Sequence, residues 1–199
     1  MNRGRDRLLT QLRPQIDDDR VLQAIAAVPR DRFVPAALRR DAWQNVPLPI
    51  GAEQTISQPL VVARMCELLE LRGDERILDI GTGSGYHAAI LAFLGAHVWS
   101  IERHPALSAQ AGKNLAAAGI GNVTLLVGDG ARGLPEEAPF AAINVAAAAT
   151  AVPPALEDQL VVGGKLVVPV KDRLYVVERT ADGVERRALE RVRFVPLIS

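Results

Sequence analysis

The chain has little cysteine, few aromatic side chains and no excess of charge of either sign. Cys66 is the one cysteine among 199 residues, which excludes an internal disulfide and a cysteine-based metal site. Lys and Arg number 23, as do Asp and Glu, so the net charge of zero offers no attraction to nucleic acid or anionic membranes. No apolar run approaches the roughly 18 residues of a membrane span, and no apolar segment follows the N-terminus as in a signal peptide. We therefore expect a soluble cytoplasmic protein.

The length and composition of the chain suit one globular domain over residues 1–199. The chain is 49% apolar, which is enough for a sizeable core. Three histidines, His87, His97 and His104, are scattered without metal-ligand spacing, so we predict no metal site. Within the domain we expect N-terminal helices and a substrate-side loop over 1–75, followed by a ligand-binding sheet over 76–199.

Strand and helix patterns alternate from residue 76 onward. They predict strands at 76–80, 97–102, 123–128, 141–146 and 165–170, and helices at 86–94, 105–118 and 153–161. This alternation is typical of an α/β protein with a doubly wound, mostly parallel, Rossmann-like sheet. Residues 163–164 are predicted to turn into the last of these strands. Segments 174–178 and 192–195, with turn residues at 182–183, predict an antiparallel C-terminal hairpin at the sheet edge.

The N-terminal part has a different character. Aspartates at 17–19 indicate the start of a helix that ends near Pro29. Residues 43–59 show neither the helix nor the strand period, which predicts a long irregular loop, often a functional feature. Pro59 then opens a helix that runs to about Leu71.

The stretch that organises the chain is Asp79-x-Gly81-x-Gly83-x-Gly85, where an apolar strand enters a glycine-rich turn before a helix. A P-loop would need a lysine after the glycines, and a dinucleotide fingerprint would need glycine at the position of Tyr86. A nucleoside ligand without a pyrophosphate remains, as does a glycine-rich turn without any ligand. Acids end the next two strands: Glu102, about 20 residues on, where a ribose-binding carboxylate is expected, and Asp129.

This pattern resembles the first motif of the S-adenosylmethionine methyltransferases with a Rossmann-like fold. The resemblance implies that the glycines pass the methionine part of the cofactor and that Glu102 binds its ribose. An acid placed like Asp129 can accept a hydrogen bond from the adenine amino group. The chain shows no acid–base pair, but a carboxylate that attacks a sulfonium methyl group is already ionised at neutral pH. It needs alignment and removal of water, for which Ser57 or Thr55 could supply a hydroxyl.

Five segments together resemble the protein-L-isoaspartate (D-aspartate) O-methyltransferase family. They are Pro-Leu-Pro-Ile-Gly at 47–51, Gln-Thr-Ile-Ser-Gln-Pro at 54–59, Asp-Ile-Gly-Thr-Gly-Ser-Gly-Tyr at 79–86, Gly-Asp-Gly at 128–130 and Val-Arg-Phe-Val-Pro-Leu at 192–197. The resemblance implies methylation of isoaspartyl carboxylates in damaged proteins and peptides, with Ser57 as the active-site residue. The predicted cofactor-binding residues are Thr55, Ile56, Ser57, Asp79, Gly81, Thr82, Gly83, Gly85, Glu102, Asp129 and Gly130.

The chain departs from the family pattern at Trp43, Asn45, Glu53, Ala141 and Ala146, several of them in or near loops expected to border the substrate. Two alternatives therefore stay open: a divergent carboxyl methyltransferase that acts on another peptide or small molecule, and a cofactor-binding protein without catalysis. Glu53 replaces a family glycine, and we expect its carboxylate to face solvent and to reduce activity on isoaspartyl peptides without abolishing it. We further expect a monomer.

Overall fold

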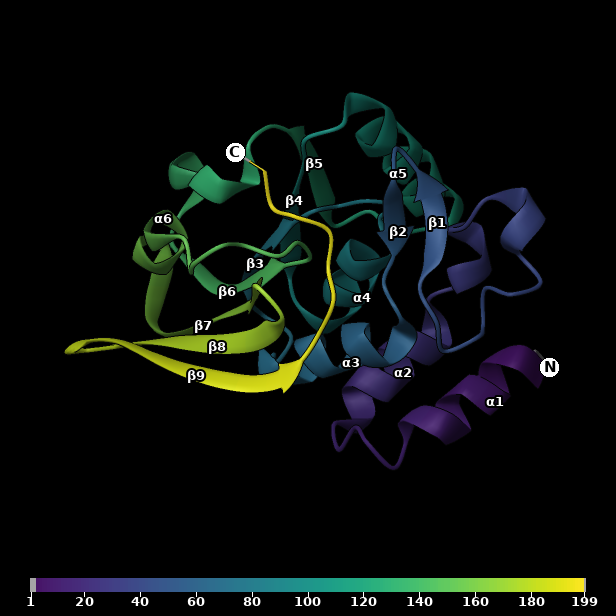
Figure 1. The fold of residues 1–199 in the computed structure, drawn as a ribbon, viewed down its shortest axis with the longest axis horizontal. Helices are drawn as coiled ribbons and strands as arrows, with labels where there is room; N and C mark the ends of the chain where they lie inside the picture. The colour runs from purple at the N-terminus through teal and green to yellow at the C-terminus, as the bar shows by residue number, and fades with distance from the viewer. Residues whose placement is uncertain (1–2, 199) are drawn as a thin grey trace.

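A computed structural model describes residues 3–198, which form a seven-stranded sheet flanked by helices, with a separate two-stranded hairpin (Figure 1). The strand order is β5-β4-β3-β6-β7-β8-β9. Neighbouring strands from β5 to β7 are parallel, whereas β8 and β9 add antiparallel at one edge. The predicted Rossmann-like class with an antiparallel C-terminal edge is confirmed.

The strands follow the apolar runs of the sequence closely in the central sheet. Their bounds are β3 (Arg76–Ile80), β4 (His97–Glu102), β5 (Val123–Val127), β6 (Phe140–Val145), β7 (Leu160–Val170), β8 (Arg173–Thr180) and β9 (Gly183–Arg191). The helices of this half are α4 (Tyr86–Leu94), α5 (Pro105–Ala117) and α6 (Pro154–Asp158).

Side chains alternate between the two faces of the sheet, and each face builds its own core. Ile77 packs toward α1–α4, whereas Leu78, next along β3, packs with α6 on the opposite face. Both faces are therefore apolar, as burial of a parallel sheet on two sides requires. Sequence order reverses at β3, whose neighbours are β4 and β6, and the carboxyl ends of strands at such a point commonly form a ligand crevice.

The N-terminal helices are α1 (Arg3–Leu12), α2 (Asp19–Ala27) and α3 (Pro59–Leu68). Asp18 caps α2, and its carboxylate accepts the backbone N–H of Arg20 and Val21. The prediction of an irregular loop over 43–59 is wrong in part. Within this segment β1 (Leu48–Gly51) and β2 (Gln54–Ile56) pair as an antiparallel hairpin. Ala52 and Glu53 connect them with φ of 49° and 57°, the left-handed pair of a tight hairpin turn.

Three C-terminal predictions also need correction. The helix expected over 153–161 ends at Asp158, and β7 begins at Leu160, so residues 163–164 lie inside a strand instead of before it. The pairing of β6 with β7 shifts register there, because the glycines form an irregularity that the apolar pattern does not reveal. The last strand is β9, so residues 192–195 lie beyond it. Residues 192–198, here called the strap, leave β9 and turn back across the molecule (Figure 1).

Candidate active site

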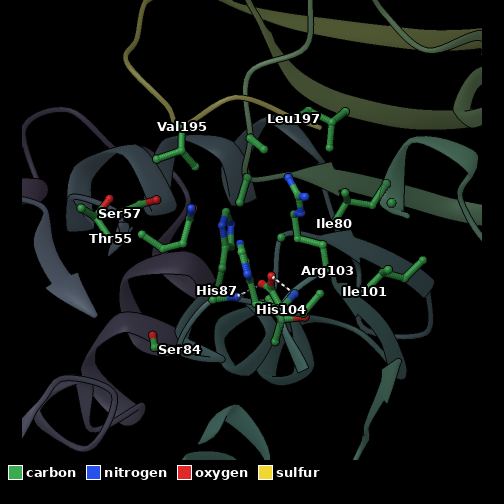
Figure 2. A pocket seen from close by; sticks show the side chains of 18 of the residues that line it. Thr55, Ser57, Ile80, Ser84, His87, Ile101, Arg103, His104, Val195 and Leu197 are labelled. Atoms are coloured by element: carbon green, nitrogen blue, oxygen red, sulfur yellow. Dashed lines mark hydrogen bonds between the residues drawn. The ribbon is translucent and has the colours of Figure 1, made fainter. Parts of the chain in front are cut away.

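A cavity of about 420 Å³ lies at the carboxyl ends of β3, β4 and β5. Figure 2 shows Thr55 and Ser57 on one side of it, Ile101 and Arg103 on the other, and Val195 and Leu197 of the strap above. The glycine-rich loop and the start of α4 form its floor. The pocket thus lies where the strand-end acids and the turn predicted a ligand site.

The glycine loop depends on backbone freedom. Gly81, Gly83 and Gly85 have φ of 92°, 54° and 89°, a region that side chains with a Cβ rarely adopt. A Cβ on Gly83 would lie 3.3 Å from Cδ1 of Ile50 in the β1–β2 hairpin. The loop therefore serves two purposes: it bends from β3 into α4, and it lets the hairpin pack beside the pocket. Gly81 and Gly83 line the cavity with Thr82, whereas Gly85 lies behind it.

Glu102 ends β4 and lines the pocket, although only 5% of it is exposed. One carboxylate oxygen accepts the backbone N–H of Gly83 at 2.9 Å, and the other accepts that of His104 at 2.9 Å. Each oxygen has a second lone pair left. The buried carboxylate is thus oriented by the glycine loop and retains acceptors that suit a pair of ligand hydroxyls.

Asp79 lies outside the lining of the cavity, and its predicted contact with the cofactor stays a prediction. Its carboxylate is fully buried, lies behind the lining and accepts Ser100 Oγ and Asn144 Nδ2, each at 2.7 Å. Ser100 Oγ lies 2.6 Å from Oγ1 of Thr82, which lines the cavity. Burial raises the pKa of Asp79 to about 6, while the two hydrogen bonds act against that rise and Glu102 adds to it. In this structure Asp79 therefore contacts the residues that build the pocket and does not itself line it.

Asp129 likewise stands outside the lining. Its carboxylate accepts the backbone N–H of Ala131 and so caps the short 3-10 helix Gly130–Arg132. Gly128 and Gly130 line the cavity in its place, and a Cβ on Gly130 would come within 2.3 Å of Cγ2 of Ile80. The third strand end therefore reaches the pocket with its backbone, and the predicted contact of Asp129 with adenine stays a prediction.

Thr55, Ile56 and Ser57 lie together where the hairpin enters α3, and all three line the pocket. Ile56 is buried and anchors this segment to the core, whereas Ser57 is half-buried and Thr55 is exposed. Among residues 3–198, neither hydroxyl has a hydrogen-bond partner. The hydroxyls are therefore free to bind a group that enters the cavity.

Further lining residues escaped the sequence analysis. Arg103 follows Glu102 directly, and it is the one arginine or lysine in the lining of the described chain. Val195 and Leu197 come from the strap, which Ala148 holds through backbone hydrogen bonds of 2.8 Å to each of them. The sequence does contain a signal for Arg103, because this residue directly follows Glu102, the predicted ribose-binding carboxylate. Residues 192–197 carry a family segment, but nothing in the sequence places Val195 and Leu197 at the cavity, because their place depends on how the chain returns over the sheet.

The wall beneath the glycine loop is His87 and Tyr86 of α4. His87 is buried, with Nε2 at 3.4 Å from Sγ of Cys66, and burial lowers its pKa to about 3, so the ring is neutral. Burial raises the pKa of Tyr86 to about 12, and the guanidinium of Arg30 lies 4.8 Å from the centre of its ring. Burial also raises the pKa of Cys66, so this buried thiol stays protonated and unreactive. None of these groups is poised as a base at neutral pH.

The departures from the family pattern separate into two kinds. Glu53 and Ala146 line the pocket, with Glu53 exposed at the hairpin tip. Trp43, Asn45 and Ala141 lie outside the lining. The amide oxygen of Asn45 accepts the backbone N–H of Leu60 at 3.0 Å and so caps the first turn of α3. An aspartate at this position could accept the same hydrogen bond. Only the first two can therefore change ligand contacts directly.

The chain is similar to known proteins along nearly its whole length. Residues 2–199 match the model of the family protein-L-isoaspartate(D-aspartate) O-methyltransferase (PCMT). The chain is 53% identical over 195 residues to protein-L-isoaspartate O-methyltransferase 2 of Marinobacter nauticus, covering 94% of this chain and 89% of the relative. It is 54% identical over 189 residues to protein-L-isoaspartate O-methyltransferase of Anaeromyxobacter dehalogenans, covering 92% of this chain and 90% of the relative.

Solved structures give the same result. A Plasmodium falciparum beta-aspartate methyltransferase in complex with S-adenosyl-L-homocysteine superposes with a TM-score of 0.85 at 26% identity, covering 100% of this chain and 99% of that one. A protein-L-isoaspartate O-methyltransferase reaches a TM-score of 0.88 at 26% identity, covering 98% of this chain and 66% of that longer one. The chain therefore belongs to the protein-L-isoaspartate(D-aspartate) O-methyltransferase family.

Proposed function

We propose that this protein is an S-adenosylmethionine-dependent methyltransferase that methylates the free carboxylate of L-isoaspartyl residues in damaged proteins and peptides. The observation that carries the proposal is one cavity with two unlike ends. Glu102 and the glycine loop form one end, and the unpaired hydroxyls of Thr55 and Ser57 form the other. Family membership supplies the chemistry that fits both ends.

The residues present fit the cofactor. The glycine loop presents backbone with no Cβ, Glu102 keeps free lone pairs for two ribose hydroxyls, and Gly128 and Gly130 leave room at the end of β5. When bound, S-adenosylmethionine supplies a methyl group activated by a sulfonium charge. No general base is required of the protein, since the substrate carboxylate is already ionised at neutral pH.

The protein's own contribution is alignment and exclusion of water. Ser57 donates its hydroxyl hydrogen to one oxygen of the substrate carboxylate and directs the other oxygen toward the cofactor side. Val195 and Leu197 of the strap cover the cavity and limit access of water. Arg103 offsets part of the negative charge that Glu102, Glu53 and the substrate carboxylate bring to one cavity.

A methyl-transfer assay on paired peptides tests the proposal. The peptides share one sequence and differ only in an isoaspartyl or aspartyl linkage, and incorporation of a labelled methyl group is measured. We expect methylation of the isoaspartyl peptide and none of its partner. Methylation of neither peptide, with another carboxylate accepted, would favour the divergent methyltransferase. Cofactor binding without any transfer would favour the non-catalytic alternative.

We further propose that the protein acts in the cytoplasm as a monomer, with isoaspartyl proteins as its only macromolecular partners. The balanced charge supports the absence of nucleic acid and anionic membranes from its partners. Separately, none of the helices within residues 3–198 combines the length and apolarity that a bilayer crossing needs. Sedimentation of the purified protein tests the monomer.

A further inference from the structure

Three polar side chains form a row across the central strands, directly beneath the glycine loop. Ser100 of β4, Asp79 of β3 and Asn144 of β6 are register partners, so their side chains project from the same face of the sheet. All three are fully buried. Asp79, in the middle, accepts one hydrogen bond from each neighbour at 2.7 Å.

Each end of the row reaches a residue that lines the pocket. On one side Ser100 contacts Oγ1 of Thr82 in the glycine loop at 2.6 Å. On the other side Nδ2 of Asn144 lies 3.3 Å from Nδ1 of His87. A single buried carboxylate is thereby connected to both the loop and the helix wall of the cavity.

The orientation of Asn144 follows from charge. With its amide turned over, Oδ1 would face the Asp79 carboxylate at 2.7 Å, and two acceptors would oppose each other. The nitrogen therefore faces Asp79, and its two hydrogens serve Asp79 and Nδ1 of His87. Because Nδ1 accepts, the proton of the neutral ring is on Nε2, which faces Sγ of Cys66.

This arrangement leaves Oδ1 of Asn144 buried without a hydrogen-bond partner among the described residues. An unpaired buried acceptor is unfavourable, so the favourable contribution of Asn144 comes from its two donors. Leucine has a similar size and no donor, and aspartate would set a second carboxylate against Asp79. Asparagine is thus the side chain of this size that can hold both groups at once.

We propose that Asn144 is a positioning residue, which orients Asp79 and His87 together and so sets the glycine loop and the α4 wall for cofactor binding. The proposal rests on the proposed function for the identity of the cofactor. It assigns no contact between Asn144 and the cofactor or the substrate.

The titratable groups facing the row define how the proposal can be tested. They are His87 of α4, Cys66 of α3 and Glu102 of β4, with Asp18 acting on Cys66 from a greater distance. At neutral pH the histidine is neutral and the thiol is protonated, because burial shifts both pKa values away from the charged forms. Asp79 is the group of the row that titrates near neutrality, and its bond from Asn144 lowers its pKa.

Removing the donors of Asn144 should therefore raise the pKa of Asp79 further. The decisive experiment measures the dissociation constant of S-adenosylhomocysteine by calorimetry from about pH 8 to about pH 5 for wild type and Asn144→Leu. The ratio of the dissociation constant of Asn144→Leu to that of wild type should rise as the pH falls. The rise should be about tenfold for each unit by which the substitution raises the pKa of Asp79. Titration of the ligand's own groups is common to both proteins and cancels in the ratio.

Nitrogen NMR of the His87 ring gives a second readout that needs no ligand. Wild type should show a single tautomer with the proton on Nε2, and Asn144→Leu should lose that preference. Asn144→Ser, a smaller side chain that keeps one donor, replaces the leucine variant if that one does not fold. It should show a smaller pH effect and the same change at His87.

The control is Ile143→Val, which trims the neighbouring residue of β6 on the opposite face of the sheet. It should shift binding, if at all, equally at every pH. A ratio for the Asn144 variants that is constant with pH, or an unchanged His87 tautomer, would overturn the proposal. Failure of wild type to bind S-adenosylhomocysteine would instead reject the proposed function, while the NMR result would still test Asn144.

Discussion

The two ends of the cavity are built on opposite principles. At the end proposed for the cofactor, Glu102 and Thr82 are buried and have partners within the protein. Glu102 accepts the backbone N–H of Gly83, and Oγ1 of Thr82 forms a hydrogen bond with Oγ of Ser100. At the end proposed for the substrate, the hydroxyls of Thr55 and Ser57 have no partner within residues 3–198. They lie on a hairpin and a helix start outside the main sheet.

This difference matches the ligand that we propose for each end. One cofactor of constant shape is suited by rigid groups on strand ends, since their hydrogen bonds are preorganised. Isoaspartyl sites occur in many sequences, so the substrate end needs few fixed contacts and an open rim. A substitution at one end of the cavity should therefore change the binding of one ligand and leave that of the other nearly unchanged.

The largest effect is expected from Ser57→Ala at the substrate end. Loss of a hydrogen bond to a charged group costs about 1.5–3 kcal/mol, so turnover of an isoaspartyl peptide should fall roughly ten- to 150-fold. The dissociation constant of S-adenosylhomocysteine should change less than about twofold, because we assign the Ser57 hydroxyl to the substrate carboxylate, although Ser57 is also a predicted cofactor-binding residue. Steady-state kinetics and calorimetry measure the two quantities.

Ser57→Thr is the matched control, because it keeps the hydroxyl and should recover most of the lost turnover. Unchanged turnover in Ser57→Ala, or a covalent adduct trapped on Ser57 in wild type, would contradict the positioning role.

Glu102→Ala tests the cofactor end. The change leaves the backbone N–H groups of Gly83 and His104 without their acceptor, and it removes the acceptors offered to the ribose. We expect cofactor affinity to weaken by about 1–3 kcal/mol, which is roughly five- to 150-fold. Calorimetry measures this, and the Michaelis constant for peptide at saturating cofactor should stay near that of wild type. Equal losses of affinity for cofactor and peptide would contradict the separation of the cavity into two ends.

The smallest effect is expected from Glu53→Gly at the rim. Glu53 is exposed, so salt screens its repulsion of a substrate carboxylate. The Michaelis constant should fall by less than about threefold, and more at low salt than at high salt. Glycine also adopts the left-handed φ of 57° without strain, so the melting temperature should rise by about 2–4 °C for about 1 kcal/mol relieved.

Ala52→Gly provides the control for Glu53→Gly, since Ala52 has a similar φ of 49° and no charge. It should raise the melting temperature alike and leave the Michaelis constant unchanged at both salt levels. If Glu53→Gly shows no salt dependence beyond that of Ala52→Gly, the carboxylate does not tune substrate binding.

The central fold was predictable because its signals are local. The run before Asp79, the glycines after it and the apolar period of 86–94 each report on neighbouring residues only. The errors occurred where local signals conflict with pairing. Prolines and polar residues hid the β1–β2 hairpin, and glycines at 163–164 resembled a turn while lying within β7.

The candidate site was likewise predictable where its signals are local and unpredictable where it depends on strand pairing. Sequence alone determined that the strand ends carrying the acids and glycines meet at one crevice, because parallel strands present their carboxyl ends at one edge. Only the tertiary structure decided that Asp79 lies behind that crevice, held by Ser100 and Asn144, which are 21 and 65 residues away. It also decided that the strap covers the pocket. Such contacts depend on strand order and register, which follow from the packing of the whole sheet and not from any single segment.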